Sequence, residues 1–460
     1  MSKNIFFMPF LVLNMFLAIV QYIVAWHITN VNNELDTKGD GVMKEKVRIG
    51  YIGLGRRGAF VLKENILQMS DVEIVYVSDL SHARMERAAD FICEQIGTTP
   101  KMTTDYRVIL KDPTIDAVFI MNGWDGRVQM AIEAMRAGKY VAIEVGCAET
   151  LESCFDLVKA YEETKIPVMM LENCCYGRRE MMVLNMVKQG LFGELVYCTG
   201  GYHHYLNECE LFKNIDNEEI PHYRLAHYRD ENCENYPTHE LGPISKVLNI
   251  NRGNRFVSLA SFGSKSVGIK DYATRVLGKE SPYAMADYKQ SDIVTTILTC
   301  AGGETVTIVL DTTLPRAYYS RNFSVRGTLG MSSEERKVVF LNGMEEEVQS
   351  NEEEMFEKYD HPLHSEYVKK GVKEGHGGMD WLVCRAFIES VKAEINTPID
   401  AYDTATWLAI GALSKESLDN GNKVVEFPDF TGGKWQNRES SPQCKYSLNE
   451  IVIDESISVV

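Results

Sequence analysis

Twelve residues decide the fold of this chain, and they read Val47-Arg48-Ile49-Gly50-Tyr51-Ile52-Gly53-Leu54-Gly55-Arg56-Arg57-Gly58. Their first half predicts a buried strand, their second half is the pattern G-x-G-x-x-G, and Ala59 to Met69 continues as a helix. Gly53 permits a tight turn, Gly55 lets backbone approach a pyrophosphate, and Gly58 lets the helix pack close to the strand. The first turn of that helix favours an anion, because its N–H groups are unpaired and its dipole end is positive. The segment therefore predicts a dinucleotide-binding loop.

An acidic residue follows at the expected place. A second strand, Val72 to Val77, ends in Ser78-Asp79, and Asp79 lies 21 residues beyond Gly58. An acid there hydrogen-bonds the adenosine ribose hydroxyls and repels a 2′-phosphate, so NAD is predicted rather than NADP. A plain structural role remains open for Asp79, as a turn or helix-capping residue before Leu80-Ser81.

Helices and strands then alternate. The predicted elements are helix Ala83–Ile96, strand Ala117–Met121, helix Val128–Ala137, strand Tyr140–Glu144, helix Leu151–Thr164 and strand Val168–Leu171. This alternation predicts a right-handed parallel sheet with helices on both faces and ligands at the carboxyl ends of its strands. The residues at that edge are Trp124-Asp125-Gly126-Arg127, Glu144-Val145 and Glu172-Asn173.

The period of the sequence changes in the second half. Strands are predicted at Leu195–Gly201, Phe256–Phe262, Ile293–Cys300 and Glu304–Leu310, without helices between the last two. The acidic stretch Glu345–Glu357 is expected to be a solvated surface segment, and two late helices are expected at Asp380–Ala393 and Tyr402–Leu418. The fold class is therefore α/β, with a Rossmann dinucleotide-binding domain at 43–172 and a C-terminal α+β domain with a mostly antiparallel open sheet at 173–435. An apolar N-terminal segment (1–42) and a tail (436–460) complete the expected domains.

Composition narrows the function. The 460 residues are 45% hydrophobic and 25% charged, which is ordinary for two globular domains. A net charge of −17 argues against a positively charged binding surface, so we expect small-molecule chemistry and no nucleic-acid partner. The 11 cysteines include no CxxC pair and predict reduced thiols. There is no HExxH motif either, and no metal is predicted.

The N-terminal segment allows two interpretations. Ile5 to Trp26 is a run of 22 almost uninterrupted apolar residues, long enough for a membrane anchor. Alternatively, Lys38-Gly39-Asp40 can be encoded by a bacterial ribosome-binding sequence shortly before Met43, which would then be the true start. The protein is expected to be cytoplasmic in the second case and membrane-anchored through residues 5–26 in the first.

Tyr, His and Arg residues cluster among Gly and Pro in the second half, a pattern that fits loops presenting side chains to a polyhydroxylated ligand. The clusters are Cys174 to Glu180, Gly201 to Tyr205, Tyr223-Arg224, Asn235 to Pro243, Pro315 to Tyr319 and His376 to Asp380.

Over roughly residues 46–430, the chain resembles the Gfo/Idh/MocA oxidoreductase superfamily. Within that superfamily it is most similar to glycoside hydrolase family 109, the NAD-dependent α-N-acetylgalactosaminidases. The segments that carry the resemblance are Met169 to Asn173, Tyr176 to Arg178, Leu184 to Val187, Gly190 to Glu194, Tyr236 to His239, Leu241 to Pro243, Leu248 to Gly253 and His376 to Asp380.

The resemblance implies roles for individual positions. It implies an NAD site of Gly53, Gly55, Arg56, Arg57, Gly58, Asp79, Trp124, Arg127, Glu144, Val145, Asn173, Tyr236 and His239. It implies a sugar site of Tyr202, Arg224, Tyr236 and Tyr318, and a catalytic pair of Tyr176 and His239. It also implies that two copies of the chain pair through the open sheet.

Three positions depart from the family pattern. Gly146 follows Glu144-Val145 where the family usually has proline. Arg127 ends the Trp124 motif where the family usually has histidine. An extra residue in Tyr318-Tyr319 blurs which tyrosine matches the family position.

The expected activity is that of an NAD-dependent glycosidase. Superfamily dehydrogenases have a lysine base where this chain has Val145, so another group must handle protons. In the hypothesis, NAD⁺ takes a hydride from C3 of the sugar while His239 assists loss of the hydroxyl proton. Tyr176, as a phenolate whose pKa Arg224 lowers, then removes the C2 hydrogen. The glycosidic oxygen leaves by elimination, water adds, and the hydride returns.

Two other readings remain open. One is a net sugar or cyclitol dehydrogenase that releases NADH. The other is a catalytically silent sensor of sugar or NAD, which a ligand would stabilise without turnover.

Overall fold

The computed structural model describes residues 44–213, 222–344, 348–369, 371, 375–438 and 444–449. Both interpretations of the N-terminus, the anchor at 5–26 and the start at Met43, lie outside these residues. Within the described ranges, no helix has the length and apolar character needed to cross a membrane.

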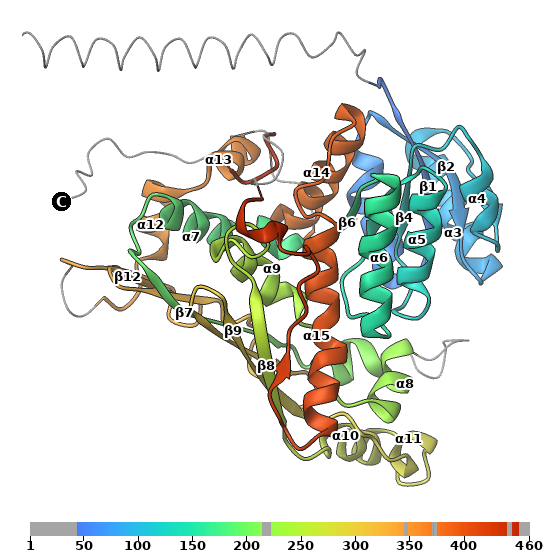
Figure 1. Cartoon of the computed structure of the whole chain (residues 1–460). Coiled ribbons are helices and arrows are strands. Elements are labelled where there is room, and N and C mark those ends of the chain that lie inside the picture. Colours follow the sequence, from blue (N-terminus) through green and yellow to red (C-terminus); the bar gives the residue numbers. More distant parts are fainter. Residues whose placement is uncertain are drawn as a thin grey trace, which may run out of the picture. The chain divides into compact units, whose positions relative to one another are not determined.

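A parallel sheet forms the first half, as the alternating pattern predicted (Figure 1). Within the described chain it has six strands in the order β3-β2-β1-β4-β5-β6, with neighbours parallel. The chain crosses from one side of β1 to the other between β3 and β4, so the strand order reverses beside β1, where open α/β sheets bind ligands. The strands are β1 (Val47–Ile52), β2 (Val72–Ser78), β3 (Lys101–Thr103), β4 (Ala117–Ile120), β5 (Tyr140–Ile143) and β6 (Val168–Met170).

Helices connect these strands. Their apolar stripes are buried against the sheet: α3, for example, buries Met85, Ala88, Ala89 and Ile92 at helical spacing. The helices are α2 (Arg56–Glu64), α3 (His82–Ile96), α4 (Arg107–Lys111), α5 (Arg127–Arg136) and α6 (Leu151–Thr164). Ser81 caps α3 and Thr150 caps α6 through side-chain oxygens.

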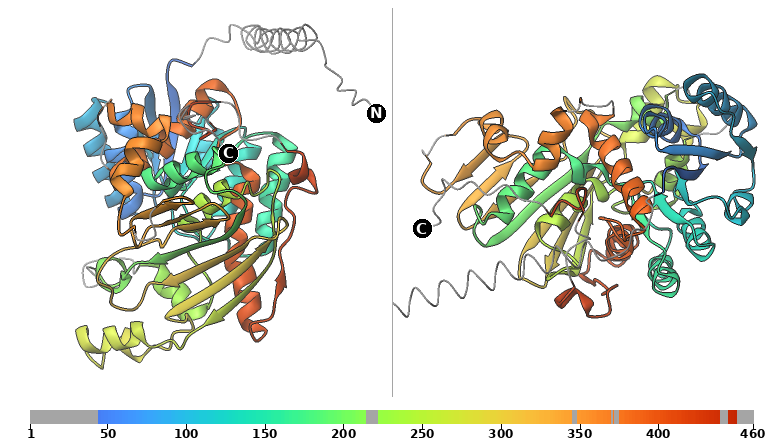
Figure 2. Two further views of the ribbon diagram at one scale, coloured as in Figure 1. Left: turned by 90° about the vertical axis from the view of Figure 1, so that its left-hand side faces the viewer. Right: turned by 90° about the horizontal axis from the view of Figure 1, so that it is seen from above.

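The second sheet is mixed and mostly antiparallel, as predicted. Its described strands run in the order β13-β12-β11-β7-β10-β9-β8-β14, with β7 and β10 parallel and every other neighbouring pair antiparallel. The strands are β7 (Leu195–His203), β8 (Phe256–Gly263), β9 (Ile293–Cys300), β10 (Thr305–Asp311), β11 (Ser324–Gly327), β12 (Gly330–Ser333), β13 (Val338–Leu341) and β14 (Val425–Glu426). In Figure 2, left, this sheet extends below the parallel one.

The second half also contains helices, several of which contact the strands of one or both sheets. They are α7 (Arg178–Lys188), α8 (Tyr223–Asp230), α9 (Thr238–Val247), α10 (Gly268–Val276), α11 (Pro282–Met285), α12 (Glu352–Tyr359), α13 (Pro362–Lys369), α14 (Met379–Ala393) and α15 (Ala401–Asp419). A single turn of 3₁₀ helix, η2 (Asn173–Tyr176), joins β6 to α7.

The two late helices connect the halves of the molecule. α14 packs on the parallel sheet, where the ring of Phe387 meets that of Phe119 edge-on at 5.1 Å. Arg385 of α14 also forms a two-pronged ion pair with Asp71, just before β2, with both N···O distances 2.7 Å. α15 contacts α6 on one side and β8 on the other. The C-terminal helices thus tie the substrate half to the nucleotide half.

The acidic stretch Glu345–Glu357 corrects one expectation. Its described part from Glu352 onward is helical (α12), and Met355 and Phe356 are buried rather than solvated. Glu352 is itself mostly buried and accepts a hydrogen bond from Arg179. The helix forms because its apolar residues can pack on α7, while most of its acids face outward.

Candidate active site and cofactor site

The glycine-rich loop has the geometry that a pyrophosphate requires. Gly53 has φ +93°, and a Cβ there would lie 2.5 Å from the backbone nitrogen of Asn122. A Cβ on Gly58 would lie 2.2 Å from the carbonyl oxygen of Gly53, which explains the close packing of α2 on β1. A Cβ on Gly55, by contrast, would meet nothing within 4 Å. The loop thus leaves an open approach at the first turn of α2, and the residues present fit NAD.

Asp79 performs the structural role that the sequence left open. Its Oδ2 accepts a hydrogen bond from the backbone N–H of Leu54 at 2.7 Å, and its Oδ1 accepts one from Ser81 at 2.9 Å. The carboxylate therefore holds the glycine-rich loop against the end of β2. This position at the tip of β2 is also where the ribose of a dinucleotide lies.

The two loop arginines bind the second half of the chain. Arg56 donates to the carbonyl of Cys209 at 2.8 Å and forms an ion pair with Glu210. Arg57 donates to both carboxylate oxygens of Asp380 in α14, at 2.8 and 2.7 Å, and lies 3.3 Å from Glu144. Both side chains were predicted to line the cofactor, and both are anchored by acids.

Arg127 is a structural residue rather than an open ligand group. Its Nη1 donates to the carbonyls of Glu144 and Val145 at 2.7 and 2.6 Å, and its Nη2 donates to the carbonyl of Asn122. Only 3% of Arg127 is exposed, and burial lowers the pKa of its guanidinium. Arg127 therefore holds together the carboxyl ends of β4 and β5, where the nicotinamide end of a dinucleotide is expected.

His239 and Glu172 form a buried dyad. The Nδ1 of His239, in the first turn of α9, lies 2.8 Å from Oε1 and 3.1 Å from Oε2 of Glu172. Burial alone would raise the pKa of Glu172, but the charge and hydrogen bond of His239 outweigh it and the pKa is lowered. Because a carboxylate only accepts, the hydrogen bond places a proton on Nδ1 and leaves Nε2 outside this contact. The sequence placed Glu172 at the ligand edge of the sheet but gave it no role in the site.

Aromatic rings surround this dyad. Ring centroids of Tyr236 and His239 are 5.0 Å apart, those of Tyr202 and His239 are 5.6 Å apart, and those of Tyr202 and Tyr236 are 4.3 Å apart. The guanidinium of Arg224 lies 4.6 Å from the ring of Tyr236 and 5.5 Å from that of Trp124. The structure thus brings the predicted sugar residues Tyr202, Arg224 and Tyr236 together with His239 and a residue of the cofactor edge.

Tyr176 lies elsewhere. Its hydroxyl donates to the backbone carbonyl of Tyr446 at 2.9 Å, in the C-terminal segment, and only 1% of the residue is exposed. Burial raises the pKa of this phenol well above its usual value. A hydroxyl bound to the carbonyl of Tyr446 is not open to a sugar hydrogen, so this geometry argues against the prediction of Tyr176 as the base.

Of the two adjacent tyrosines, Tyr319 and not Tyr318 lies in the ring cluster. Tyr318 is 59% exposed and donates to Glu335 at 2.7 Å, away from the ring cluster. The ring of Tyr319 instead meets His204 at 5.2 Å and Tyr202 at 6.2 Å. Tyr319 therefore lies in the ring cluster, in the place predicted for Tyr318.

His204 extends the cluster by a hydrogen bond. Its Nδ1 lies 2.9 Å from the hydroxyl of Tyr202. Burial lowers the pKa of His204 to about 4, assisted by the charge of Arg224, so the ring is neutral at pH 7. A neutral imidazole can accept a hydrogen bond from the Tyr202 hydroxyl.

Two further acids lie behind the dyad without exposure to solvent. Glu234 precedes Tyr236 and Glu240 follows His239, and both are 0% exposed. Burial raises the pKa of Glu234 to about 8, and burial together with Glu234 raises the pKa of Glu240 well above its usual value. Both carboxyls therefore hold protons at neutral pH. Local sequence gave no signal for them, since a glutamate reads as a surface residue.

One group of described residues has donor atoms close enough for a metal ion. Single ligand atoms of Glu172, Cys174 and His239 lie within 4.8 Å of one another. The hydrogen bond between Glu172 and His239 already explains two of these positions. Burial raises the pKa of the Cys174 thiol well above its usual value, which favours the neutral thiol.

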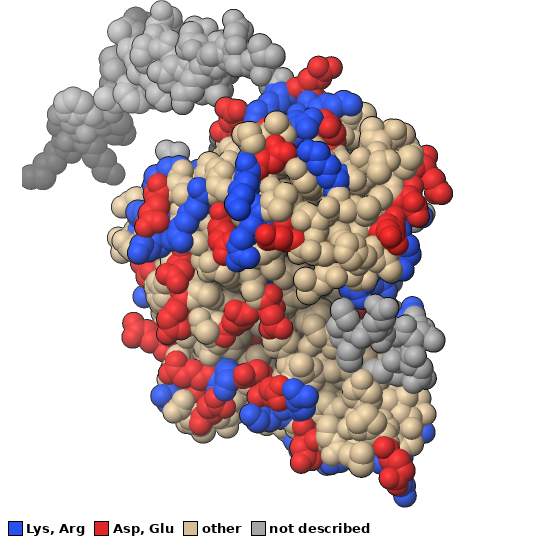
Figure 3. All heavy atoms as spheres, turned by 90° about the vertical axis from the view of Figure 1, so that its right-hand side faces the viewer, with Lys and Arg blue, Asp and Glu red and all other residues tan. Residues whose placement is uncertain are grey.

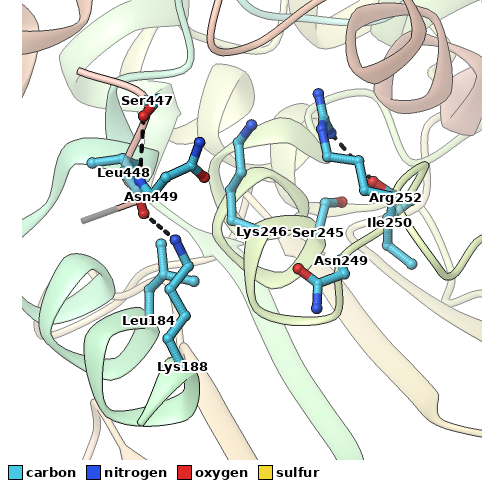
Figure 4. Close-up of a pocket in the computed structure, with 10 residues that line it drawn as sticks. All are labelled: Leu184, Lys188, Ser245, Lys246, Asn249, Ile250, Arg252, Ser447, Leu448 and Asn449. Carbon is cyan, nitrogen blue, oxygen red and sulfur yellow. Dashed lines mark hydrogen bonds between the residues drawn. The ribbon is translucent and has the colours of Figure 1, made fainter. Parts of the chain in front are cut away.

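A small cavity lies apart from this cluster (Figure 4). It is bounded by α7, by the end of α9 with the loop that follows, and by the C-terminal segment. Its lining residues are Leu184, Lys188, Ser245, Lys246, Asn249, Ile250, Arg252, Ser447, Leu448 and Asn449. It therefore contains none of the predicted site residues.

Acidic and basic side chains are interspersed on the face of the molecule shown in Figure 3. Neither sign forms a continuous patch there.

Comparison with known proteins agrees with both halves. The model of the oxidoreductase family with an NAD-binding Rossmann fold matches residues 47–171, and that of the glycosyl hydrolase 109 C-terminal domain matches residues 176–437. A glycosyl hydrolase family 109 protein of Stenotrophomonas maltophilia is 37% identical over 415 residues, covering 86% of this chain and 91% of that protein. An α-N-acetylgalactosaminidase of Tannerella forsythia is 36% identical over 422 residues, covering 87% and 89%.

Solved structures show the same fold at low identity. A levoglucosan dehydrogenase in complex with NADH and L-sorbose has a TM-score of 0.64 at 17% identity, covering 84% of this chain and all of that one. A myo-inositol dehydrogenase of Lactobacillus casei in complex with NAD(H) and myo-inositol has a TM-score of 0.55 at 17% identity, covering 85% and 100%.

The matched halves, the glycine-rich loop and the relatives of similar length lead to one conclusion. The chain belongs to glycosyl hydrolase family 109 and is an NAD-dependent enzyme of the Gfo/Idh/MocA fold.

Proposed function

We propose that this enzyme hydrolyses α-linked N-acetylgalactosaminides with no net redox change. The observation that carries the proposal is the His239–Glu172 dyad, which lies beside the rings of Tyr202 and Tyr236 at the carboxyl edge of the NAD-binding sheet. The relative from Tannerella forsythia that is named α-N-acetylgalactosaminidase supports this substrate.

His239 is suited to move a hydroxyl proton. Its Nε2 accepts the proton of the sugar's C3 hydroxyl, and the carboxylate of Glu172 stabilises the imidazolium that forms. NAD, when bound at the glycine-rich loop, supplies the acceptor for the C3 hydride and returns that hydride at the end of the cycle. Val145 cannot perform the proton transfer, because its side chain has no titratable group.

Tyr202 and His204 are suited to move the second proton, from C2. Once C3 is a ketone, the C2 hydrogen is acidified and its removal expels the oxygen at C1. Burial raises the pKa of Tyr202, and the nearby cation of Arg224 opposes that rise. The hydroxyl of Tyr202 lies 2.9 Å from the acceptor nitrogen of His204. This pair replaces Tyr176, whose hydroxyl is bound to Tyr446.

Arg224 and the rings around it bind and orient the sugar. Only 7% of Arg224 is exposed, and its Nε has no hydrogen-bond partner among the described residues. A buried cation with an unused donor is suited to a ligand oxygen, and aromatic faces suit the apolar faces of a sugar.

Incubating the purified protein with an aryl α-N-acetylgalactosaminide in D₂O, without added NAD, tests the proposal. We expect release of the aglycone and deuterium at C2 of the product sugar. Release without deuterium at C2 would eliminate the proposed proton chemistry. Formation of NADH from free sugar and added NAD, with no aglycone release, would identify a net dehydrogenase instead. Thermal stabilisation by sugar without either product would identify a silent sensor.

A further inference from the structure

The segment His376-Gly377-Gly378-Met379-Asp380 places an acid of the second half inside the nucleotide site. Gly378 has φ +96°, and a Cβ there would lie 2.3 Å from the ring of Tyr367, so this turn requires glycine. The turn leads directly into α14, whose second residue is Asp380.

All of the hydrogen-bonding capacity of Asp380 is used in binding neighbours. Its side chain is 0% exposed. It accepts two hydrogen bonds from Arg57, at 2.7 and 2.8 Å, and one from the amide of Asn173, at 2.6 Å. The Nδ1 of His376 lies 2.8 Å from Oδ2. Burial would raise the pKa of Asp380, but these partners lower it strongly, so the group is a carboxylate.

The partners of Asp380 come from separate parts of the cofactor edge. Arg57 lies within the G-x-G-x-x-G segment, in the first turn of α2, and Asn173 begins η2 just beyond the end of β6. Arg57 also contacts Glu144, at the end of β5. One carboxylate from α14 thus links the loop that receives the pyrophosphate to the strand ends expected to face the nicotinamide.

The charge of Arg57 is balanced within the protein. Two carboxylates, Asp380 and Glu144, contact its guanidinium. An arginine held in this way cannot move freely toward a phosphate. Its ion pairs instead stabilise the position of the glycine-rich loop.

We propose that Asp380 is a positioning residue that keeps NAD bound throughout the catalytic cycle, by locking the glycine-rich loop to the far edge of the cofactor site. The idea rests on the proposed function, since a hydride that is returned to the same sugar requires the same cofactor molecule to stay. Separating the loop from α14 requires breaking the two-pronged bond to Arg57.

The experiment measures release of NAD rather than turnover. Protein loaded with radiolabelled NAD is mixed with excess unlabelled NAD, and the bound label is followed over time. Asp380→Asn keeps the shape of the side chain but removes its charge. We expect release at least about tenfold faster than in the unmodified protein, because the loop can then leave α14 without breaking a buried charge pair.

Asp71→Asn is the matched control. Asp71 also forms a two-pronged ion pair between the nucleotide half and α14, with Arg385, but it lies at the start of β2, at the opposite end of that strand from the cofactor edge. We expect its effect on thermal stability to resemble that of Asp380→Asn and its NAD release rate to stay unchanged. Equal acceleration in both variants would reduce Asp380 to a general docking contact and overturn the proposal.

If Asp380→Asn does not fold, His376→Ala provides the test in its place. The His376 side chain is 59% exposed, so its loss leaves the fold intact while removing one partner of Asp380. We expect a severalfold faster release than in Asp71→Asn; equal release rates in the two would contradict the proposal. No glycoside is present in these assays, so their outcome is independent of whether the enzyme cleaves one.

Discussion

Gly146 lies against Trp124 with no space for a side chain: a Cβ on Gly146 would be 2.3 Å from the indole nitrogen of Trp124 and 3.3 Å from Nη1 of Arg127. Gly146 has φ +146°, which proline cannot adopt. The two departures from the family pattern, glycine for proline and Arg127 for histidine, therefore meet at one point of the structure. Arg127 fills the space beside Trp124 and donates hydrogen bonds to the carbonyls of Glu144 and Val145, which precede Gly146.

Restoring either family residue alone is expected to destabilise the protein, and restoring both is expected to cost less than the sum of the single changes. Gly146→Pro clashes with the present backbone, and Arg127→His leaves the carbonyls of Asn122, Glu144 and Val145 without their donor. Each single change is expected to cost about 2–3 kcal/mol of unfolding free energy, and the double change less than the sum by about 1 kcal/mol or more. Urea unfolding of the four proteins in a double-mutant cycle measures the coupling. Additive costs would show that the two positions are independent.

Glu172→Gln tests the dyad. The amide keeps the shape and one hydrogen-bond acceptor, but it cannot stabilise an imidazolium at His239. We expect kcat to fall by about 10²–10⁴, with KM for the glycoside changed little, because the charge acts only when the proton moves. Steady-state kinetics of the NAD-loaded variant provide the measurement. Full activity would show that His239 works without its carboxylate partner.

Much of the fold follows from local sequence. The strand predicted at Ile293–Cys300 has those bounds in the structure, and the helix predicted at Asp380–Ala393 begins one residue earlier. Both carry a clear apolar period that packing reinforces. α12 was missed because its consecutive acids conceal the pair Met355-Phe356, which becomes buried only when α7 is present beside it.

The sequence predicted which residues gather in the site but not which of them pair with one another. Tyr202, Arg224, Tyr236 and His239 were all singled out and lie together. The partner of His239, however, is 67 positions away in sequence, and that of Arg57 is 323 positions away. Such pairings depend on how helices α9 and α14 dock on the sheets, which no local pattern encodes. For the same reason, the direction of the Tyr176 hydroxyl was not available from its neighbours in the chain.

Tyr176→Phe and Tyr202→Phe separate the two candidate bases. The first removes a buried hydrogen bond to Tyr446 and is expected to lower the unfolding free energy by about 1 kcal/mol while kcat changes by less than about threefold. The second removes the hydroxyl that contacts His204 and is expected to lower kcat by about 10²-fold or more. Deuterium incorporation at C2 and aglycone release are measured for both. Loss of activity in Tyr176→Phe alone would restore Tyr176 as the base.

Tyr319→Ala and Tyr318→Ala test which tyrosine contacts the sugar. Tyr319 meets the rings of His204 and Tyr202, so its loss is expected to raise KM by about tenfold through lost packing. Tyr318 donates to Glu335 on the exposed side, and its loss is expected to change KM by less than about twofold. The reverse order of effects would assign the sugar contact to Tyr318.

The buried carboxyl of Glu234 predicts how stability depends on pH. In the unfolded chain this group ionises near its usual pKa of 4.5, whereas in the folded protein burial raises the pKa to about 8. Between these values the folded state keeps a proton that the unfolded state has released, so the contribution of Glu234 is fully present at low pH and is lost as pH rises toward 8. Glu234→Gln, which cannot ionise, is expected to flatten this decline. Thermal unfolding of both proteins at several pH values from about 5 to about 8.5 provides the comparison. An unchanged slope in the variant would mean that Glu234 is ionised in the folded protein, and the proton would then have to be assigned to Glu240.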